Sequence, residues 1–146
     1  FYRNYHLDIT IARPFHHTGP GQSDRFFFSA VARRLATWMP SAGPTLTLPD
    51  LDCRRDVLHV QDVAAAYEAL LLNGKPNEAY NVCSGTAVTC RELVTLMIRT
   101  SGRTLQLASE ATGSEADAVP VLCGNNTKLR TETGWRRCSA KVRSAS

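Results

Sequence analysis

The sequence has few of the features that mark membrane, metal-binding or disulfide-stapled proteins. No apolar run approaches the ~20 residues that a bilayer-spanning helix needs, so we expect no membrane partner. The five cysteines are an odd number without a Cys-x-x-Cys pair, which indicates neither a zinc site nor a disulfide framework. We therefore expect no metal. Free cysteines within apolar, strand-like runs favour a reducing cytoplasm as the location.

Acidic residues are missing from the last stretch of the chain. The sequence has 17 basic and 13 acidic residues. Four of the basic residues lie in this last stretch and account for the formal net charge of +4, so the rest of the chain is neutral. These four are Arg136, Arg137, Lys141 and Arg143. A nucleic-acid-binding face needs basic residues clustered on a folded surface with stacking aromatics. We therefore expect no nucleic-acid partner, and we interpret 136–146 as a basic disordered tail that follows a folded region at 1–135.

Helices and strands alternate along this region with short turns, a pattern typical of an α/β fold. At 146 residues and 43% hydrophobic content the chain is long enough to bury a core. The expected strands are about 7–13, 45–48, 79–83, 105–108 and 119–123, and the expected helices are 24–39, 62–73, 89–100 and 126–133. Asp24 and Asp62 are predicted to cap the first two helices, and Thr89 and Glu92 have the spacing of a capping box. The polar stretch 109–118 is predicted to be a mobile loop.

The stretch 11–22 is the most informative of the chain, because an apolar strand runs into a loop that concentrates cations, imidazoles and glycines. Arg13, His16 and His17 lie where the strand ends, and Pro14 is expected to end its pairing. Glycines nearby remove the Cβ atoms that would keep a ligand from the backbone. In open α/β sheets, ligands bind beyond the carboxyl ends of strands. The loop therefore suits a phosphate-bearing ligand, and the competing interpretation is an ordinary proline- and glycine-rich turn.

Four blocks in order resemble one family. Residues 12–22 read Ala-Arg-Pro-Phe-His-His-Thr-Gly-Pro-Gly-Gln. This resembles the Ala-Arg-Pro-Phe-Asn-His-Thr-Gly-Pro-Gly-Gln run of the extended short-chain dehydrogenase/reductase family, in its nucleotide-sugar epimerase, dehydratase and reductase branch. The blocks 55–63, 79–85 and 126–135 are also similar to this family. The sequence of the four blocks is most similar to that of its GDP-4-keto-6-deoxy-mannose reductases. The resemblance implies a Rossmann-type α/β fold.

Two family motifs are missing from the 146 residues. There is no Gly-x-x-Gly-x-x-Gly fingerprint for a dinucleotide pyrophosphate. There is also no Tyr-x-x-x-Lys pair, which performs the family's acid–base chemistry. We therefore interpret the chain as the C-terminal, substrate-binding portion of a longer enzyme whose N-terminal dinucleotide-binding unit is missing, and we assign no catalytic residue. The resemblance implies NAD or NADP as cofactor and a homodimer for the full-length enzyme, and we do not expect the cofactor to bind this chain alone.

The resemblance also implies roles for site residues. Arg55 matches the arginine that clamps the nucleotide-sugar diphosphate, since a guanidinium can meet phosphate oxygens with two bonds. His16 and Gln22 belong to the substrate-binding set, and the set that faces the nicotinamide consists of Pro14, Phe15 and His17. From the helical pattern, Arg33 could reach back to the same loop, although adjacent arginines on a helix usually form a solvated face. Asp56 is expected to orient Arg55, and His59 to be structural.

Two departures from the family pattern bear on the ligand. His16 stands where the family usually has an asparagine that donates to the diphosphate. Glu115 lies in a stretch where the family usually has a second phosphate-binding arginine, and a carboxylate would repel the ligand there. We expect the substrate-binding segment of an NAD(P)-dependent reductase, dehydratase or epimerase that acts on a GDP-hexose. The alternative is a noncatalytic remnant or interaction fragment.

Overall fold

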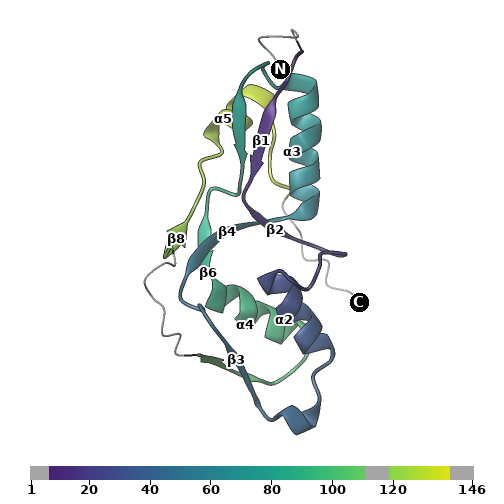
Figure 1. Ribbon diagram of the computed structural model, residues 1–146, viewed down its shortest axis with the longest axis vertical. Coiled ribbons are helices and arrows are strands. Elements are labelled where there is room, and N and C mark those ends of the chain that lie inside the picture. The colour runs from purple at the N-terminus through teal and green to yellow at the C-terminus, as the bar shows by residue number, and fades with distance from the viewer. Residues whose placement is uncertain (1–6, 111–118, 139–146) are drawn as a thin grey trace.

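The computed structural model describes residues 7–110 and 119–138 (Figure 1). Glu115, most of the predicted loop 109–118 and residues 139–146 of the predicted tail lie outside the described residues. The strands are β1 Ile11–Pro14, β2 His16–Thr18, β3 Thr45–Leu48, β4 Arg54–His59, β5 Ala79–Val82, β6 Ala87–Thr89, β7 Gln106–Ser109 and β8 Val121–Leu122. The helices are α2 Phe27–Ala36, α3 Val60–Asn73, α4 Cys90–Thr100 and α5 Thr127–Thr133, with a 3-10 turn η1 at Pro40–Ala42. The expected α/β class is confirmed.

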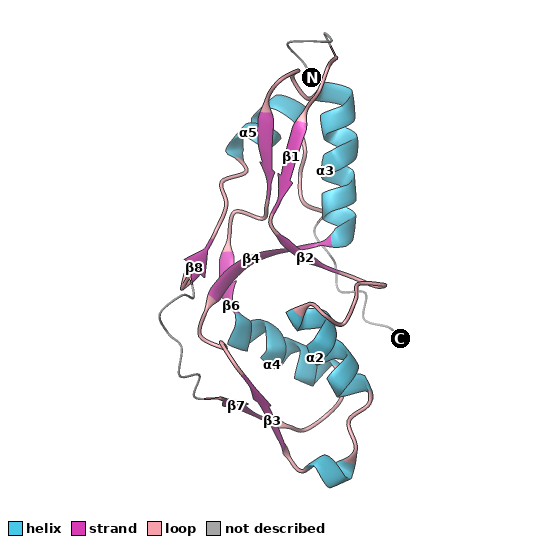
Figure 2. Cartoon of the chain, in the orientation of Figure 1, coloured by secondary structure: helices cyan, strands magenta, loops and turns pink. Residues whose placement is uncertain are grey.

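Three small sheets follow one another along an elongated molecule (Figure 2). At one end β1 pairs with β5, with α3 beside β1 and α5 beside β5. In the middle, β4 pairs with β2 and β8 in parallel and with β6 in antiparallel orientation. At the other end β3 pairs with β7 in parallel, near α2 and α4. The middle sheet therefore connects the two ends.

Each end of the molecule has its own apolar core. The first is formed by α3, α5 and the strands beside them, and its buried members are Leu58, Val63, Ala66, Leu70, Tyr80, Val82, Leu129 and Trp135. The second is formed by α2, α4 and β3 with its following turn, and consists of Val31, Leu35, Leu46, Leu48, Leu51, Val94 and Ile98. In each helix the buried residues are spaced three or four apart, which puts them on one face. β4 contributes the buried Leu58 to the first core and leads from one core to the other.

The first strand begins later than the sequence predicts. Leu7 to Thr10 precede β1, and Pro14 is still paired, with Val82 of β5. The N–H groups of Ile11 and Phe15 donate to carbonyls of the β5 segment at 2.9 and 3.0 Å. Backbone groups alternate along a strand, so the nitrogen of Pro14 lies on the opposite edge, where proline interrupts none of these bonds. The pairing with β5 does end at Pro14, as predicted, with one further bond from the Phe15 N–H, but the proline ring is not what interrupts it.

Two predicted helix caps were also wrong. α3 begins at Val60, and His59 is its N-cap, with Nδ1 accepting from the Gln61 N–H at 3.2 Å. Asp62 instead accepts from the Cys138 N–H at 2.8 Å. α2 begins only at Phe27, without a side-chain cap. The predicted capping box of α4 is confirmed: Thr89 and Glu92 each accept from the other's backbone N–H.

Candidate functional site

A cavity of about 450 Å³ lies where β1 passes into β2. Its lining consists of Pro14, Phe15, His16, His17, Gln22, Phe26 and Leu122. Five of these seven are among the site residues that the sequence predicts. Phe26 and Leu122 were not predicted. The cavity therefore combines two imidazoles and an amide with an apolar wall.

The chain changes sheets at this cavity. The Phe15 N–H still donates to Val82 O of β5, whereas His16 is already in register with Val57 of β4. The Nδ1 atom of His17 lies 2.9 Å from the Phe15 carbonyl oxygen, which fixes the ring against the bend. Beyond β2, a Cβ at Gly19 would clash with the side chain of Val60 at the start of α3. Glycine is thus required for this loop to pass close to the helix.

Gln22 holds the loop that follows β2. Its Nε2 donates to His17 O at 2.9 Å, and its Oε1 accepts from Ser29 Oγ of α2 at 2.7 Å. Its own N–H donates to Gly19 O at 3.3 Å, closing the turn. Both polar atoms of the side chain are therefore engaged in positioning the cavity wall.

Arg55 lies on β4 in register with Leu122, which lines the cavity, although Arg55 itself does not line it. Its Nη1 donates to Val119 O at 2.8 Å and to Arg54 O at 2.9 Å, so the guanidinium is anchored to the segment that leads into β8. Burial lowers the pKa of His16 from its usual value, and the positive charge of Arg55 lowers it further. Asp56 opposes this effect. The His16 imidazole is consequently neutral at neutral pH.

Asp56 is fully buried and does not have the expected partner. We expected it to orient Arg55, but within the described residues its carboxylate accepts from backbone N–H groups of two other segments instead. Oδ1 accepts from the Ser84 N–H at 2.7 Å, and Oδ2 accepts from the Gly85 and Gly124 N–H groups at 2.9 and 3.3 Å. These segments follow β5 and β8, so Asp56 joins the turn after β5 to the segment after β8.

Arg33 lies away from the lining of the cavity. Its side chain is 70% exposed on α2 and forms an ion pair with Asp24. Asp24, which the sequence predicts as a cap, is thus the partner of this arginine. A substrate role for Arg33 stays a prediction.

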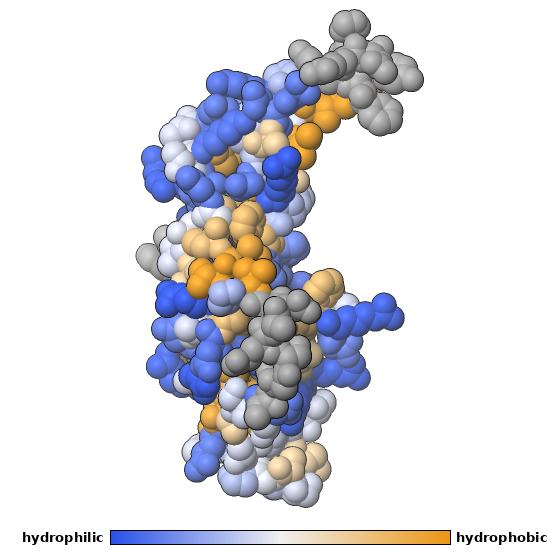
Figure 3. Space-filling view, turned by 60° about the vertical axis from the view of Figure 1, so that its left-hand side comes forward, coloured by the Kyte–Doolittle hydropathy of each residue, from blue (hydrophilic) through white to orange (hydrophobic). Residues whose placement is uncertain are grey.

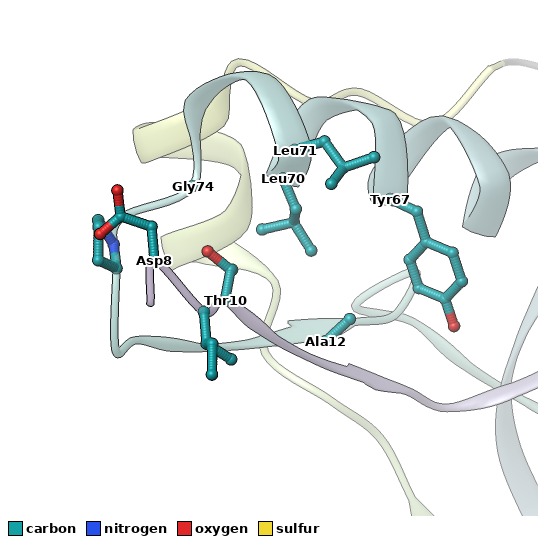
Figure 4. Close-up of a pocket in the computed structure, with 9 residues that line it drawn as sticks. Asp8, Thr10, Ala12, Tyr67, Leu70, Leu71 and Gly74 are labelled. Atoms are coloured by element: carbon teal, nitrogen blue, oxygen red, sulfur yellow. The ribbon is translucent and has the colours of Figure 1, made fainter. Parts of the chain in front are cut away.

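A second cavity, of about 680 Å³, lies between β1 and α3. Figure 4 shows Tyr67, Leu70 and Leu71 on the helix side and Thr10 and Ala12 on the strand side. Leu71 is 88% exposed, so this face of α3 is largely uncovered in the described chain. Figure 3 shows a further area of hydrophobic surface about halfway along the long axis of the molecule. None of the predicted site residues lines this second cavity.

Within residues 7–110 and 119–138, no cluster of three or more histidine, cysteine or acidic side chains is arranged to hold a metal ion. The helices in these ranges are also too short or too polar to cross a membrane.

A family model described as GDP-mannose 4,6 dehydratase matches residues 1–141. The chain belongs to this family. It lies within the extended short-chain dehydrogenase/reductases that the sequence blocks resemble. Among curated relatives, the GDP-6-deoxy-D-mannose reductase of Pseudomonas aeruginosa is 35% identical over 129 residues, which are 88% of this chain and 42% of that protein.

Solved structures agree with this family assignment. The structure of RMD from Pseudomonas aeruginosa in complex with NADPH superposes with a TM-score of 0.83 at 33% identity, covering 94% of this chain and 46% of that one. A UDP-glucose 4-epimerase from Thermotoga maritima, solved with UDP-glucose, has a TM-score of 0.78 at 23% identity and shows the shared fold, covering 93% of this chain and 43% of that one. The chain thus spans less than half the length of each of these matched proteins.

Proposed function

We propose that this chain forms the nucleotide-sugar-binding part of an NAD(P)-dependent oxidoreductase that acts on a GDP-hexose, of the GDP-4-keto-6-deoxy-mannose reductase type. The observation that carries the proposal is the cavity at the β1–β2 bend, which gathers five of the seven predicted site residues. The 35% identity to a GDP-6-deoxy-D-mannose reductase supports the choice of substrate class. The NADPH complex of a relative supports the choice of cofactor.

The residues around the cavity suit this ligand. Arg55 supplies a permanent positive charge and a planar fork of N–H donors that matches a diphosphate. His16 adds a donor that becomes cationic on protonation. Phe15, Phe26 and Leu122 give an apolar wall against which a flat ring can pack. In this proposal Gln22 contributes by holding the loop.

The proposed reaction needs groups that this chain does not supply. A bound nicotinamide would exchange a hydride with C4 of the sugar. In the family that this chain resembles, a Tyr-x-x-x-Lys pair performs the accompanying proton transfer. No such pair occurs in the 146 residues. The residues described above bind and orient the sugar nucleotide, and the chemistry is assigned to no residue of this chain.

Arg55→Ala tests the proposal directly. Parent and variant are both made as a fusion protein. In this fusion, the part of the Pseudomonas aeruginosa reductase that this chain does not match is placed ahead of Phe1. Loss of a bidentate, charge-assisted contact should weaken GDP binding by roughly thirty- to a hundredfold, on the order of 2 to 3 kcal/mol. Calorimetric titration of GDP measures the change, and NADPH affinity should barely move.

Arg33→Ala is the matched control for this titration, because Arg33 is an exposed arginine paired with Asp24. Its GDP affinity should differ from that of the parent by less than about threefold. Equal GDP affinities for Arg55→Ala and the parent would mean that Arg55 is structural. A strong loss in Arg33→Ala would instead place that residue in the substrate site.

The lowered pKa of His16 predicts how binding depends on pH. In the free protein the fold favours the neutral imidazole, and this contribution to stability is present above about pH 6.5 and is lost as the pH falls. A bound diphosphate favours the protonated form, so binding takes up a proton. Affinity for GDP-mannose should therefore rise as the pH is lowered from about 7.5 to 5.5, by up to tenfold for each unit of pKa difference.

His16→Asn controls the pH experiment, because an amide donates a hydrogen bond without titrating. In this variant the dependence on pH should be flat. GDP-mannose is the suitable ligand, since a diphosphate diester lacks the titrating phosphate monoester of GDP. A parent protein whose affinity does not change with pH would show that His16 does not face the diphosphate.

The uncovered face of α3 favours a second candidate, a noncatalytic interaction fragment. Leu71 and Leu72 are 88% and 74% exposed, and the adjoining cavity is mostly apolar. Such a face is typical of a surface that another polypeptide covers. The fusion described above discriminates the two candidates: nucleotide-sugar binding supports the enzyme part, and a folded fusion that binds no GDP supports the fragment.

A further inference from the structure

Two cysteines outside the nucleotide site lie in direct contact. The Sγ atoms of Cys53 and Cys90 are 3.2 Å apart, although 37 positions separate the two residues in the chain. Cys53 precedes β4, and Cys90 opens α4 directly after β6. The antiparallel β4–β6 register pairs Arg54 with Thr89. Continuing this register by one residue places Cys53 opposite Cys90.

The backbone around the two cysteines is well suited to a crosslink. The Cys90 N–H donates to Cys53 O at 2.9 Å, which holds the two main chains side by side. Directly opposed residues of antiparallel strands have Cα atoms roughly 4.5 to 5.5 Å apart, which falls within the range that disulfides span. Closing the sulfurs to a bond of about 2.05 Å therefore needs only a small rotation of the side chains.

We propose that Cys53 and Cys90 are a thiol-oxidation site that forms a reversible disulfide in response to a hydroperoxide. This inference does not depend on the proposed function. The disulfide ties the turn before β4 to the first residue of α4.

The two thiols have different exposure, which sets the order of the steps. Cys53 is half-buried, whereas Cys90 is 4% exposed. Burial and the contact with Cys53 raise the pKa of Cys90 above its usual value, which disfavours its thiolate form. Cys53 is thus the residue that meets the oxidant and Cys90 the residue that resolves the product.

The chemistry balances with hydrogen peroxide as the oxidant. The Cys53 thiolate attacks one peroxide oxygen, the O–O bond breaks, and the departing hydroxide takes up a proton to leave water and a sulfenic acid. The Cys90 sulfur then attacks the Cys53 sulfur, the S–S bond forms, and the hydroxyl leaves as water with the Cys90 thiol proton. Two thiols are oxidised, and one peroxide is reduced to two waters.

The test uses the chain with its exposed thiols Cys123 and Cys138 replaced by serine. Hydrogen peroxide should lower the number of titratable thiols in the unfolded, oxidised protein from three to one, and dithiothreitol should restore all three. Under non-reducing conditions, peptide mapping should find the peptide containing Cys53 linked to the one containing Cys90. The crosslink closes a long loop, so the oxidised protein should melt at least about 5 °C higher than the reduced one.

Two variants keep the result interpretable. Cys83 shares a tryptic peptide with Cys90, so the variant Cys90→Ser shows which of the two is bonded to Cys53. Loss of the linked peptide in this variant supports the proposal. Cys53→Ser changes a half-buried residue, and its melting temperature should be the same with and without peroxide. A linked peptide that persists in Cys90→Ser, or a Cys53 that stops at a sulfinic acid without any crosslink, would overturn the proposal.

Discussion

No oxidoreductase turnover is expected when this chain is supplied with NADPH and a GDP-4-keto-6-deoxy-hexose. The sequence has neither the tyrosine–lysine pair nor the glycine-rich turn that the family uses for proton transfer and for the cofactor pyrophosphate. A positioned general acid contributes roughly 10²- to 10⁴-fold, and without a held cofactor no hydride is delivered. Loss of the near-ultraviolet absorbance of NADPH, followed over hours, measures the residual rate.

The fusion with the unmatched part of the Pseudomonas aeruginosa reductase is the positive control for this assay. It should restore turnover, and Arg33→Ala in the fusion should leave the rate nearly unchanged. Turnover by the chain alone, purified from cells that contain no related reductase, would mean that the chain holds its own cofactor site. A fusion that binds GDP yet remains inactive would limit the proposal to substrate binding.

Asp56→Ala should be the most destabilising single substitution among those considered, at about 3 to 5 kcal/mol. The carboxylate is fully buried and accepts from the N–H groups of Ser84, Gly85 and Gly124. Alanine would leave these donors without an acceptor and open a cavity between two turns. Urea unfolding followed by circular dichroism gives the change in the free energy of unfolding.

Asp52→Ala is the matched control, since Asp52 is an exposed aspartate in an ion pair with Arg91. It should cost less than about 1 kcal/mol, as surface ion pairs generally do. Asp56→Asn retains one acceptor oxygen but turns an NH₂ group toward N–H donors, and it should fall between the two. If Asp56→Ala and Asp52→Ala unfold at similar urea concentrations, the buried carboxylate does not stabilise the turns.

The fold class and most elements were predictable because they depend on local patterns. β3 has the predicted bounds, and β5 and α4 agree to within one residue, since apolar spacing and a capping box determine them. The start of α2 and the cap of α3 were not predictable in this way. Several polar residues near each helix start have cap-forming side chains, and tertiary contacts decide which one is used: Asp24 is taken by Arg33 and Asp62 by the Cys138 N–H.

The candidate site was predictable where its residues are consecutive. Pro14, Phe15, His16 and His17 lie in one short stretch, so any fold of the bend brings them together. Leu122 was missed because its place in the cavity depends on the parallel pairing of β8 with β4, which joins residue 122 to residue 55. The role of Asp56 was missed for the same reason, since its partners come from two distant turns.

The strand register also has a consequence for the time course of folding. Residue 11 pairs with residue 79, residue 45 with residue 106, and residue 54 with residue 121, all in parallel. For each of these pairs, the two strands must come together across a long loop before any hydrogen bond between them forms. The entropy cost of closing this loop slows folding. Helices form locally within about a microsecond, so the sheets are the late event. Until then the strand residues of β1 and β3 remain unpaired, and this interval is when the chain is most exposed to aggregation.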